Sequence, residues 1–130
     1  MTDLIDFLNA RLAEDEAVAQ AATPGPWNDD GGCISNADYQ ITDYGAYTKA
    51  DGEPEEWEPQ RQRADSAHIA RHDPARVLRE VTAKRAIIAD VEPDDPSAFI
   101  DGWRDEHWRV LSLLAVVYSD HPEFREEWRP

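Results

Sequence analysis

The chain has 130 residues, the length of one ordinary domain, and its 28 acidic and 13 basic side chains give a formal net charge of −15. This charge disfavours direct binding to nucleic acid or to an anionic membrane, because both kinds of binding depend on basic residues. Hydrophobic residues make up 41% of the chain and include five Trp, four Tyr and three Phe, so we expect a packed core and a single domain over residues 1–130.

The negative charge is concentrated in the first half of the sequence. Residues 1–60 contain 14 acidic and two basic side chains, a net charge of −12, whereas residues 61–130 contain 14 acidic and 11 basic side chains, a net charge of −3. The N-terminus carries acids where a signal peptide needs bases, and the longest apolar run is too short to span a membrane. One cysteine, Cys33, cannot form an intrachain disulfide. We therefore expect a complete, small cytoplasmic protein.

Residues 1–22 are predicted to form an amphipathic helix. Leu4, Leu8 and Leu12 recur at i, i+4 spacing, while the acidic residues lie mostly on other faces. The helix is expected to end at residues 23–27 (TPGPW), because two prolines cannot continue it. From residue 28 to residue 48 the helical period disappears, and turn signals separate two short alternating segments, residues 33–35 and 39–42. A small antiparallel sheet is predicted for residues 28–48.

Residues 49–63 are predicted to form an acidic loop, because acidic residues alternate there with Pro and Gly and show no period. Residues 64–130 are predicted to be helical. A short helix spans residues 64–71, and two more begin at Asp73-Pro74 and Asp95-Pro96, where Asp is the N-cap and Pro the first helical residue. The apolar stretch 110–118 is the expected central buried element. The expected core tryptophans are Trp27, Trp103, Trp108 and Trp128.

These elements predict an α+β fold. It contains an N-terminal helix, a small antiparallel sheet, and then three helices packed as a single layer over the sheet, followed by a C-terminal turn of helix.

Three histidines are candidate ligands for a metal ion or a small molecule: His68, His72 and His121. The first two are four residues apart, which places both imidazoles on one helix face, as a zinc or nickel pair requires. The alternative is that His72 ends its helix and donates a hydrogen bond to a terminal carbonyl. His72-Asp73 also matches the dyad of metal-dependent phosphohydrolases, but no His precedes His68 to complete such a site.

The acidic loop is a candidate surface for a protein partner. Its carboxylates can imitate the spacing of DNA phosphates and occupy a basic site on another protein, and a tryptophan supplies the anchor that such an interface needs. The alternative is a solvated loop without a partner. The candidate partner-binding residues are Asp51, Glu53, Glu55, Glu56, Trp57 and Glu58.

Three motifs resemble the signatures of an actinobacterial and actinophage family of unknown function. They are ATPGPW at residues 22–27, DSAHIARHDPARVL at residues 65–78 and YSDHPEFREEWRP at residues 118–130. The first two also resemble segments of the Ead-like early proteins of temperate phages. The resemblance implies a small cytoplasmic protein of phage, prophage or actinobacterial genomes, and it implies no catalytic residue or cofactor.

Taken together, these features predict a non-catalytic accessory protein that binds another protein, either a basic one or a second copy of itself. Its action is expected to inhibit or modulate a host or defence protein. The alternative is a protein that binds a metal or small ligand through His68, His72 and His121, and a metal-dependent hydrolase is the least favoured function. Apart from such a metal, we expect no cofactor, and we expect no contact with nucleic acid or membrane.

Overall fold

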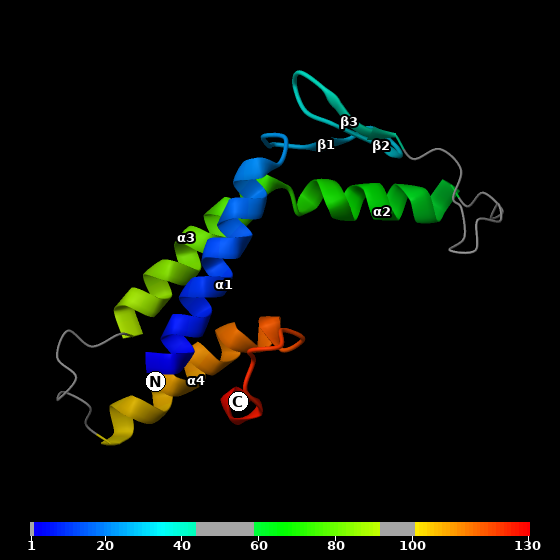
Figure 1. The fold of residues 1–130 in the computed structure, drawn as a ribbon. Coiled ribbons are helices and arrows are strands. Elements are labelled where there is room, and N and C mark those ends of the chain that lie inside the picture. Colours follow the sequence, from blue (N-terminus) through cyan, green and yellow to red (C-terminus); the bar gives the residue numbers. More distant parts are fainter. Residues whose placement is uncertain (1, 44–58, 92–100) are drawn as a thin grey trace. The chain divides into compact units, whose positions relative to one another are not determined.

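A computed structural model describes residues 2–43, 59–91 and 101–130 (Figure 1). The order of elements confirms the α+β class, with an N-terminal helix, a three-stranded antiparallel sheet and further helices. The elements are α1 (Thr2–Ala21), β1 (Asn28–Asp29), β2 (Cys33–Ser35), β3 (Gln40–Asp43), α2 (Pro59–Arg71), α3 (Pro74–Val91), α4 (Asp101–Ala115) and the short 3-10 helices η2 (Val116–Tyr118) and η3 (Glu126–Trp128). Among the described residues, none of these helices has the length and apolar character that crossing a bilayer requires.

The chain divides into two compact units. The first, which we call the terminal unit, consists of residues 1–17 and 79–130, and the second, the middle unit, consists of residues 18–78. The terminal unit contains 17 acidic and eight basic side chains, and the middle unit contains 11 acidic and five basic side chains. The acidity of the first half of the sequence is therefore shared between the two units.

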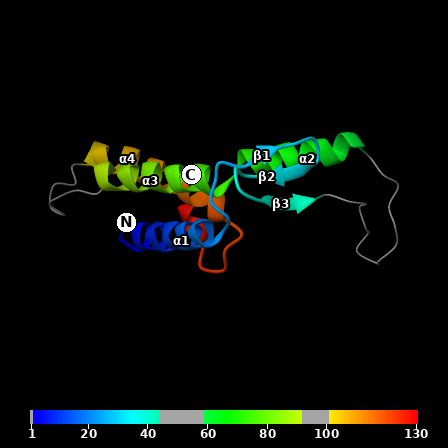
Figure 2. The same cartoon turned by 90° about the horizontal axis from the view of Figure 1, so that it is seen from above.

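In the middle unit, α2 packs against the sheet. The strands lie in the order β1-β2-β3, and α2 contacts β1 and β2, as both views show (Figures 1 and 2). Ile34 in β2 and Ser66 in α2 are fully buried, and the Ser66 hydroxyl donates a hydrogen bond to the Asp29 carboxylate in β1. This bond, together with the amides of Gly31 and Gly32, holds the pKa of Asp29 below its usual value.

The turn between β1 and β2 requires glycine. Gly31 and Gly32 have φ values of 76° and 120°, a region that other residues rarely adopt. Helix α2, in turn, begins at Pro59 rather than at the expected residue 64, so residues 59–63 of the predicted acidic loop are helical. The fixed φ of proline suits the first turn of a helix. The rest of that predicted loop lies outside the described residues.

Asp73 joins the turn after α1 to the start of α3. Its buried carboxylate accepts hydrogen bonds from the backbone amides of Trp27 and Arg76, both at 2.8 Å. This confirms the predicted N-cap. Gly25 lies so close that an added Cβ would sit 2.7 Å from Asp73 Oδ2 and 2.8 Å from the Ala75 Cβ, so only glycine fits there. The first two sequence motifs therefore meet at one helix cap.

In the terminal unit, the buried face of α1 is the one that its periodicity predicts. Leu4, Leu8 and Leu12 are almost completely buried. The other buried apolar side chains of this unit are Ile5, Phe7, Val81, Ile88, Val91, Leu111, Ala115 and Trp128. Of the remaining tryptophans expected in the core, Trp27 and Trp108 are half-buried, and the Trp103 side chain lies outside the described part, as does the predicted helix start at Asp95-Pro96.

The prediction that residues 110–118 form a central buried element is wrong for one face of the helix. Leu111, Ser112 and Ala115 are fully buried, but three apolar side chains at i, i+3 and i+7 spacing face solvent. These are Val110, Leu113 and Val117, with exposed fractions of 37%, 51% and 63%. When the residues of a helix are apolar on nearly every side, the sequence does not tell which sides pack against other elements and which remain exposed.

Replacing Asp73 with Ala removes both hydrogen bonds to its carboxylate, so we expect the free energy of unfolding to fall by about 1–3 kcal/mol. Asp73→Asn keeps an acceptor at the N-cap and should lose less. Urea unfolding followed by tryptophan fluorescence measures both effects. Asp38→Ala removes an exposed aspartate elsewhere in the same unit and serves as the control. An Asp73→Ala variant as stable as this control would contradict the assignment.

Candidate functional site

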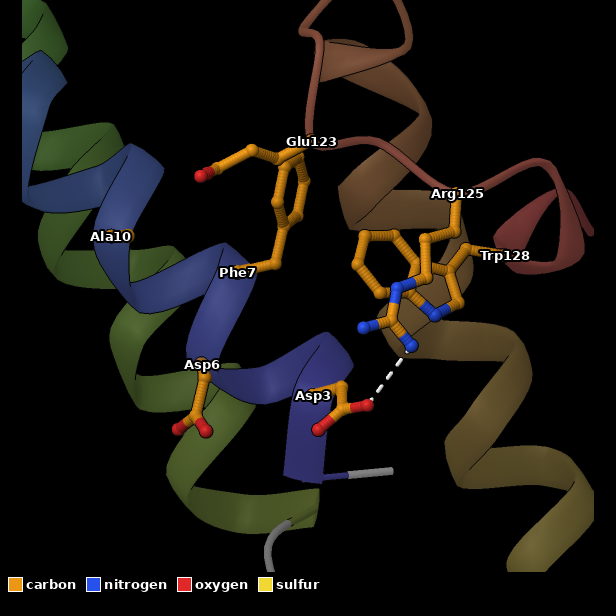
Figure 3. A pocket seen from close by; sticks show the side chains of 7 residues that line it. All are labelled: Asp3, Asp6, Phe7, Ala10, Glu123, Arg125 and Trp128. Atoms are coloured by element: carbon orange, nitrogen blue, oxygen red, sulfur yellow. Dashed lines mark hydrogen bonds and ion pairs between the residues drawn. The ribbon is translucent and has the colours of Figure 1, made fainter.

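An open pocket of about 500 Å³ lies in the terminal unit, between the start of α1 and the C-terminal segment (Figure 3). We call it the acidic pocket, because three carboxylates and one guanidinium line it. Its lining residues are Asp3, Asp6, Phe7 and Ala10 from α1 and Glu123, Arg125 and Trp128 from the C-terminal segment.

Two buried aromatic rings support the pocket. Phe7 and Trp128 lie with their ring centroids 4.9 Å apart, and Phe124 packs against both, at 6.2 Å from Phe7 and 5.9 Å from Trp128. Tyr118 and His121 approach the Phe7 ring edge-on, at 6.4 Å and 5.8 Å. This aromatic cluster fixes the C-terminal segment on α1, so the pocket walls are held by packing.

Arg125 lies across the pocket. Its Nη1 donates a hydrogen bond to Asp3 Oδ2 at 2.9 Å, and its guanidinium carbon lies 5.3 Å from the centroid of the Trp128 ring (Figure 3). The two side chains of this ion pair are 53% and 65% exposed, and such an exposed pair contributes at most about 1 kcal/mol. Among the described residues, Asp6 makes no hydrogen bond or ion pair.

A buried arginine holds the other side of the pocket. The Arg11 guanidinium donates hydrogen bonds to Glu123 at 3.1 Å and to Glu14 at 2.8 Å, and it contacts the His121 imidazole at 2.7 Å. Arg11 Nε is buried and has no partner among the described residues. Because removing one partner from a buried charge is costly, Arg11 fixes Glu123 at the rim of the pocket.

This arrangement suits a cationic group. Carboxylates form charge-assisted hydrogen bonds with a guanidinium or ammonium, and the faces of aromatic rings attract cations. The polar groups that line the described pocket are three carboxylates and one guanidinium.

The three candidate histidines are divided between the two units. His68 and His72 belong to the middle unit, with ring centroids 4.4 Å apart, and His121 belongs to the terminal unit. The His72 Nδ1–H donates to the carbonyl of His68 at 2.8 Å, which is the helix-ending role weighed above. Within the described ranges, no group of three or more His, Cys, Asp or Glu side chains is placed to hold a metal ion.

The side chains of His72 and Asp73 both take part in helix ends. His72 bonds to the last turn of α2, and Asp73 caps α3. The candidate partner-binding residues Asp51, Glu53, Glu55, Glu56, Trp57 and Glu58 lie outside the described residues.

Sequence reasoning missed the acidic pocket. Asp3 and Arg125 are 122 positions apart, and neither belongs to a motif that indicates contact with the other. An acid in the first turn of a helix, such as Asp3 in α1, is stabilised by the helix dipole and therefore gives no sign of another partner. The only available signal was the aromatic content of residues 118–130, which predicts packing but not its partner.

Tyr118 gives the terminal unit a sensitivity to alkaline pH. Burial, together with the hydrogen bond that its hydroxyl donates to Asp15 at 2.6 Å, raises the pKa of Tyr118 far above its ordinary value. At pH values between the pKa of Tyr118 in the unfolded state and its higher pKa in the folded state, only the folded protein keeps this proton. The contribution of Tyr118 to the free energy of unfolding is therefore fully present well below pH 10. It is lost as the pH rises above about 10, by up to about 1.4 kcal/mol per pH unit.

We therefore expect Tyr118→Phe to reduce the loss of unfolding free energy between about pH 9 and pH 11.5. Tyr39→Phe, at an exposed tyrosine of the middle unit, is the matched control and should follow the wild type. Equal alkaline losses in Tyr118→Phe and the wild type would refute this role of Tyr118.

Comparison with known proteins gives a family but no activity. No curated protein and no solved structure matches the chain. The model of a family of unknown function, DUF6221, matches residues 1–130. Since the match covers every residue given, the chain belongs to DUF6221, a family of unknown function.

Proposed function

We propose that this protein is a non-catalytic binding protein that recognises a basic protein through the acidic pocket. The observation that carries the proposal is the placement of Asp3, Asp6 and Glu123 around buried aromatic rings, with Asp6 lacking a partner among the described residues. A cationic side chain that enters the pocket gains a carboxylate partner and an aromatic surface together.

Charge and packing have separate effects in such a contact. The terminal unit carries 17 acidic against eight basic side chains, and a field of this sign accelerates the approach of a basic surface. The aromatic rings supply the desolvated contact that gives affinity. A second copy of the chain carries the same net charge of −15, so the pocket favours a basic protein over self-association.

The predicted acidic loop stays in the proposal as a second contact surface. Its residues are Asp51, Glu53, Glu55, Glu56, Trp57 and Glu58. The resemblance of the three sequence motifs supports the biological part of the proposal. In this role the protein is a cytoplasmic accessory factor of phage, prophage or actinobacterial type, which inhibits or modulates a host or defence protein.

The test begins with affinity capture from a lysate of the organism that encodes the chain. The captured protein is then purified, and calorimetry compares its binding to the wild type and to Asp3→Asn/Asp6→Asn. Loss of two charge-assisted contacts should weaken binding by at least about 10-fold. Binding to the wild type should also weaken as the salt concentration rises.

Asp38→Asn/Asp90→Asn is the matched control, because it removes two exposed carboxylates outside the pocket. It should change the affinity by less than about twofold, as distant exposed charges do at physiological salt. A further variant neutralises the five acids of the predicted loop. A pocket variant that binds as tightly as the control would refute the proposed site, and a loss only in the loop variant would move the site to the loop.

A further inference from the structure

We infer that the acidic pocket is a site for an arginine side chain of the partner, and that Arg125 fills this site until the partner's arginine replaces it. The inference rests on the proposed binding of a basic protein. The ligand is then a guanidinium, and Arg125 of the same chain competes with it for the pocket.

The contacts that Arg125 makes in the pocket indicate which chemical group the ligand carries. Its guanidinium bonds to Asp3 at one edge while the same group lies 5.3 Å from the centre of the Trp128 ring. A planar guanidinium can place its face on an aromatic ring and donate hydrogen bonds from its edges at the same time. A lysine ammonium is a strongly hydrated point charge and gains less from this pair of contacts. The site therefore selects arginine over lysine.

The contacts of Arg125 are weak enough to exchange. Both side chains of the Arg125–Asp3 pair are more than half exposed. Glu127 Oε1 lies 3.7 Å from the same Arg125 nitrogen, so a second carboxylate can retain Arg125 after it leaves Asp3. Arg11 differs in every respect, since its side chain is only 7% exposed and bonds to Glu14 and Glu123. Arg125 is thus the exchangeable cation of the pocket, whereas Arg11 is a fixed cation behind its wall.

An incoming arginine also has a contact that Arg125 does not use. Asp3 and Asp6 are one helical turn apart on α1, and of these two carboxylates Arg125 bonds only to that of Asp3. Figure 3 shows the Asp3 carboxylate pointing toward Arg125 and the Asp6 side chain pointing away from it. A ligand that enters from solvent is not tethered to the C-terminal segment, and the Asp6 carboxylate, which has no partner among the described residues, remains open to it.

The test is an NMR titration of the full chain with N-acetyl-L-arginine amide and, separately, with Nα-acetyl-L-lysine amide. Amide signals of residues 3–10 and 123–128 and the Trp128 indole signal report binding. We expect weak binding of the arginine probe to the wild type and binding at least threefold tighter to Arg125→Gln. The lysine probe should bind at least threefold more weakly than the arginine probe.

Two further variants complete the design. Arg85→Gln removes the arginine of another, partly exposed ion pair of the terminal unit, the 2.7 Å pair with Glu16, and should bind the arginine probe as the wild type does. Asp3→Asn in the Arg125→Gln background should abolish the gain in affinity. Because Arg125 is exposed, its replacement should leave the spectrum of the folded protein intact, and unchanged amide dispersion verifies this.

The inference is overturned if Arg125→Gln binds the arginine probe no more tightly than the wild type, or if neither binds it. These outcomes are distinct from failure of the proposed function. If the purified basic partner needs Asp3 and Asp6 but binds Arg125→Gln no better than the wild type, the proposed function stands and the exchange of Arg125 does not. If the partner does not need Asp3 and Asp6, both proposals fail.

Discussion

The packing of Phe7 against Trp128 holds together the two segments whose side chains line the acidic pocket. It joins the first helix of the chain to a segment that ends at the C-terminus, with ring centroids 4.9 Å apart. Because both rings are buried, the contact removes a large apolar area from water and fixes the two segments in one position. This packing helps to place Arg125 within hydrogen-bond distance of Asp3.

The same contact changes how the charge of the chain should be understood. In the sequence, the acidity belongs to residues 1–60, which carry a net charge of −12. In the structure, residues 1–17 pack with residues 79–130, so the acids of α1 lie beside arginines from the other end of the chain. Arg11 and Arg125 then differ in function although both are cations in acidic surroundings. The buried one supports the pocket, and the exposed one occupies it.

Local patterns predicted local structure well. The i, i+4 leucines of α1, the strand at residues 33–35 and the Asp73 cap all follow from interactions between residues close in sequence or from strong backbone preferences. The acidic pocket and the exposed face of α4 could not be predicted in this way. Both depend on which segments pack together, and these segments are up to 122 residues apart in the sequence. An apolar or acidic pattern in one segment does not show which other segment packs against it.

Hydrogen–deuterium exchange with and without the purified basic partner tests most directly whether the acidic pocket is the binding site. If the partner binds in the acidic pocket, it should slow exchange in residues 3–10 and 123–128, where the pocket walls lie, and not along the sheet and α2 of the middle unit. Unchanged exchange in both pocket segments of a partner-saturated sample would show that the partner binds elsewhere.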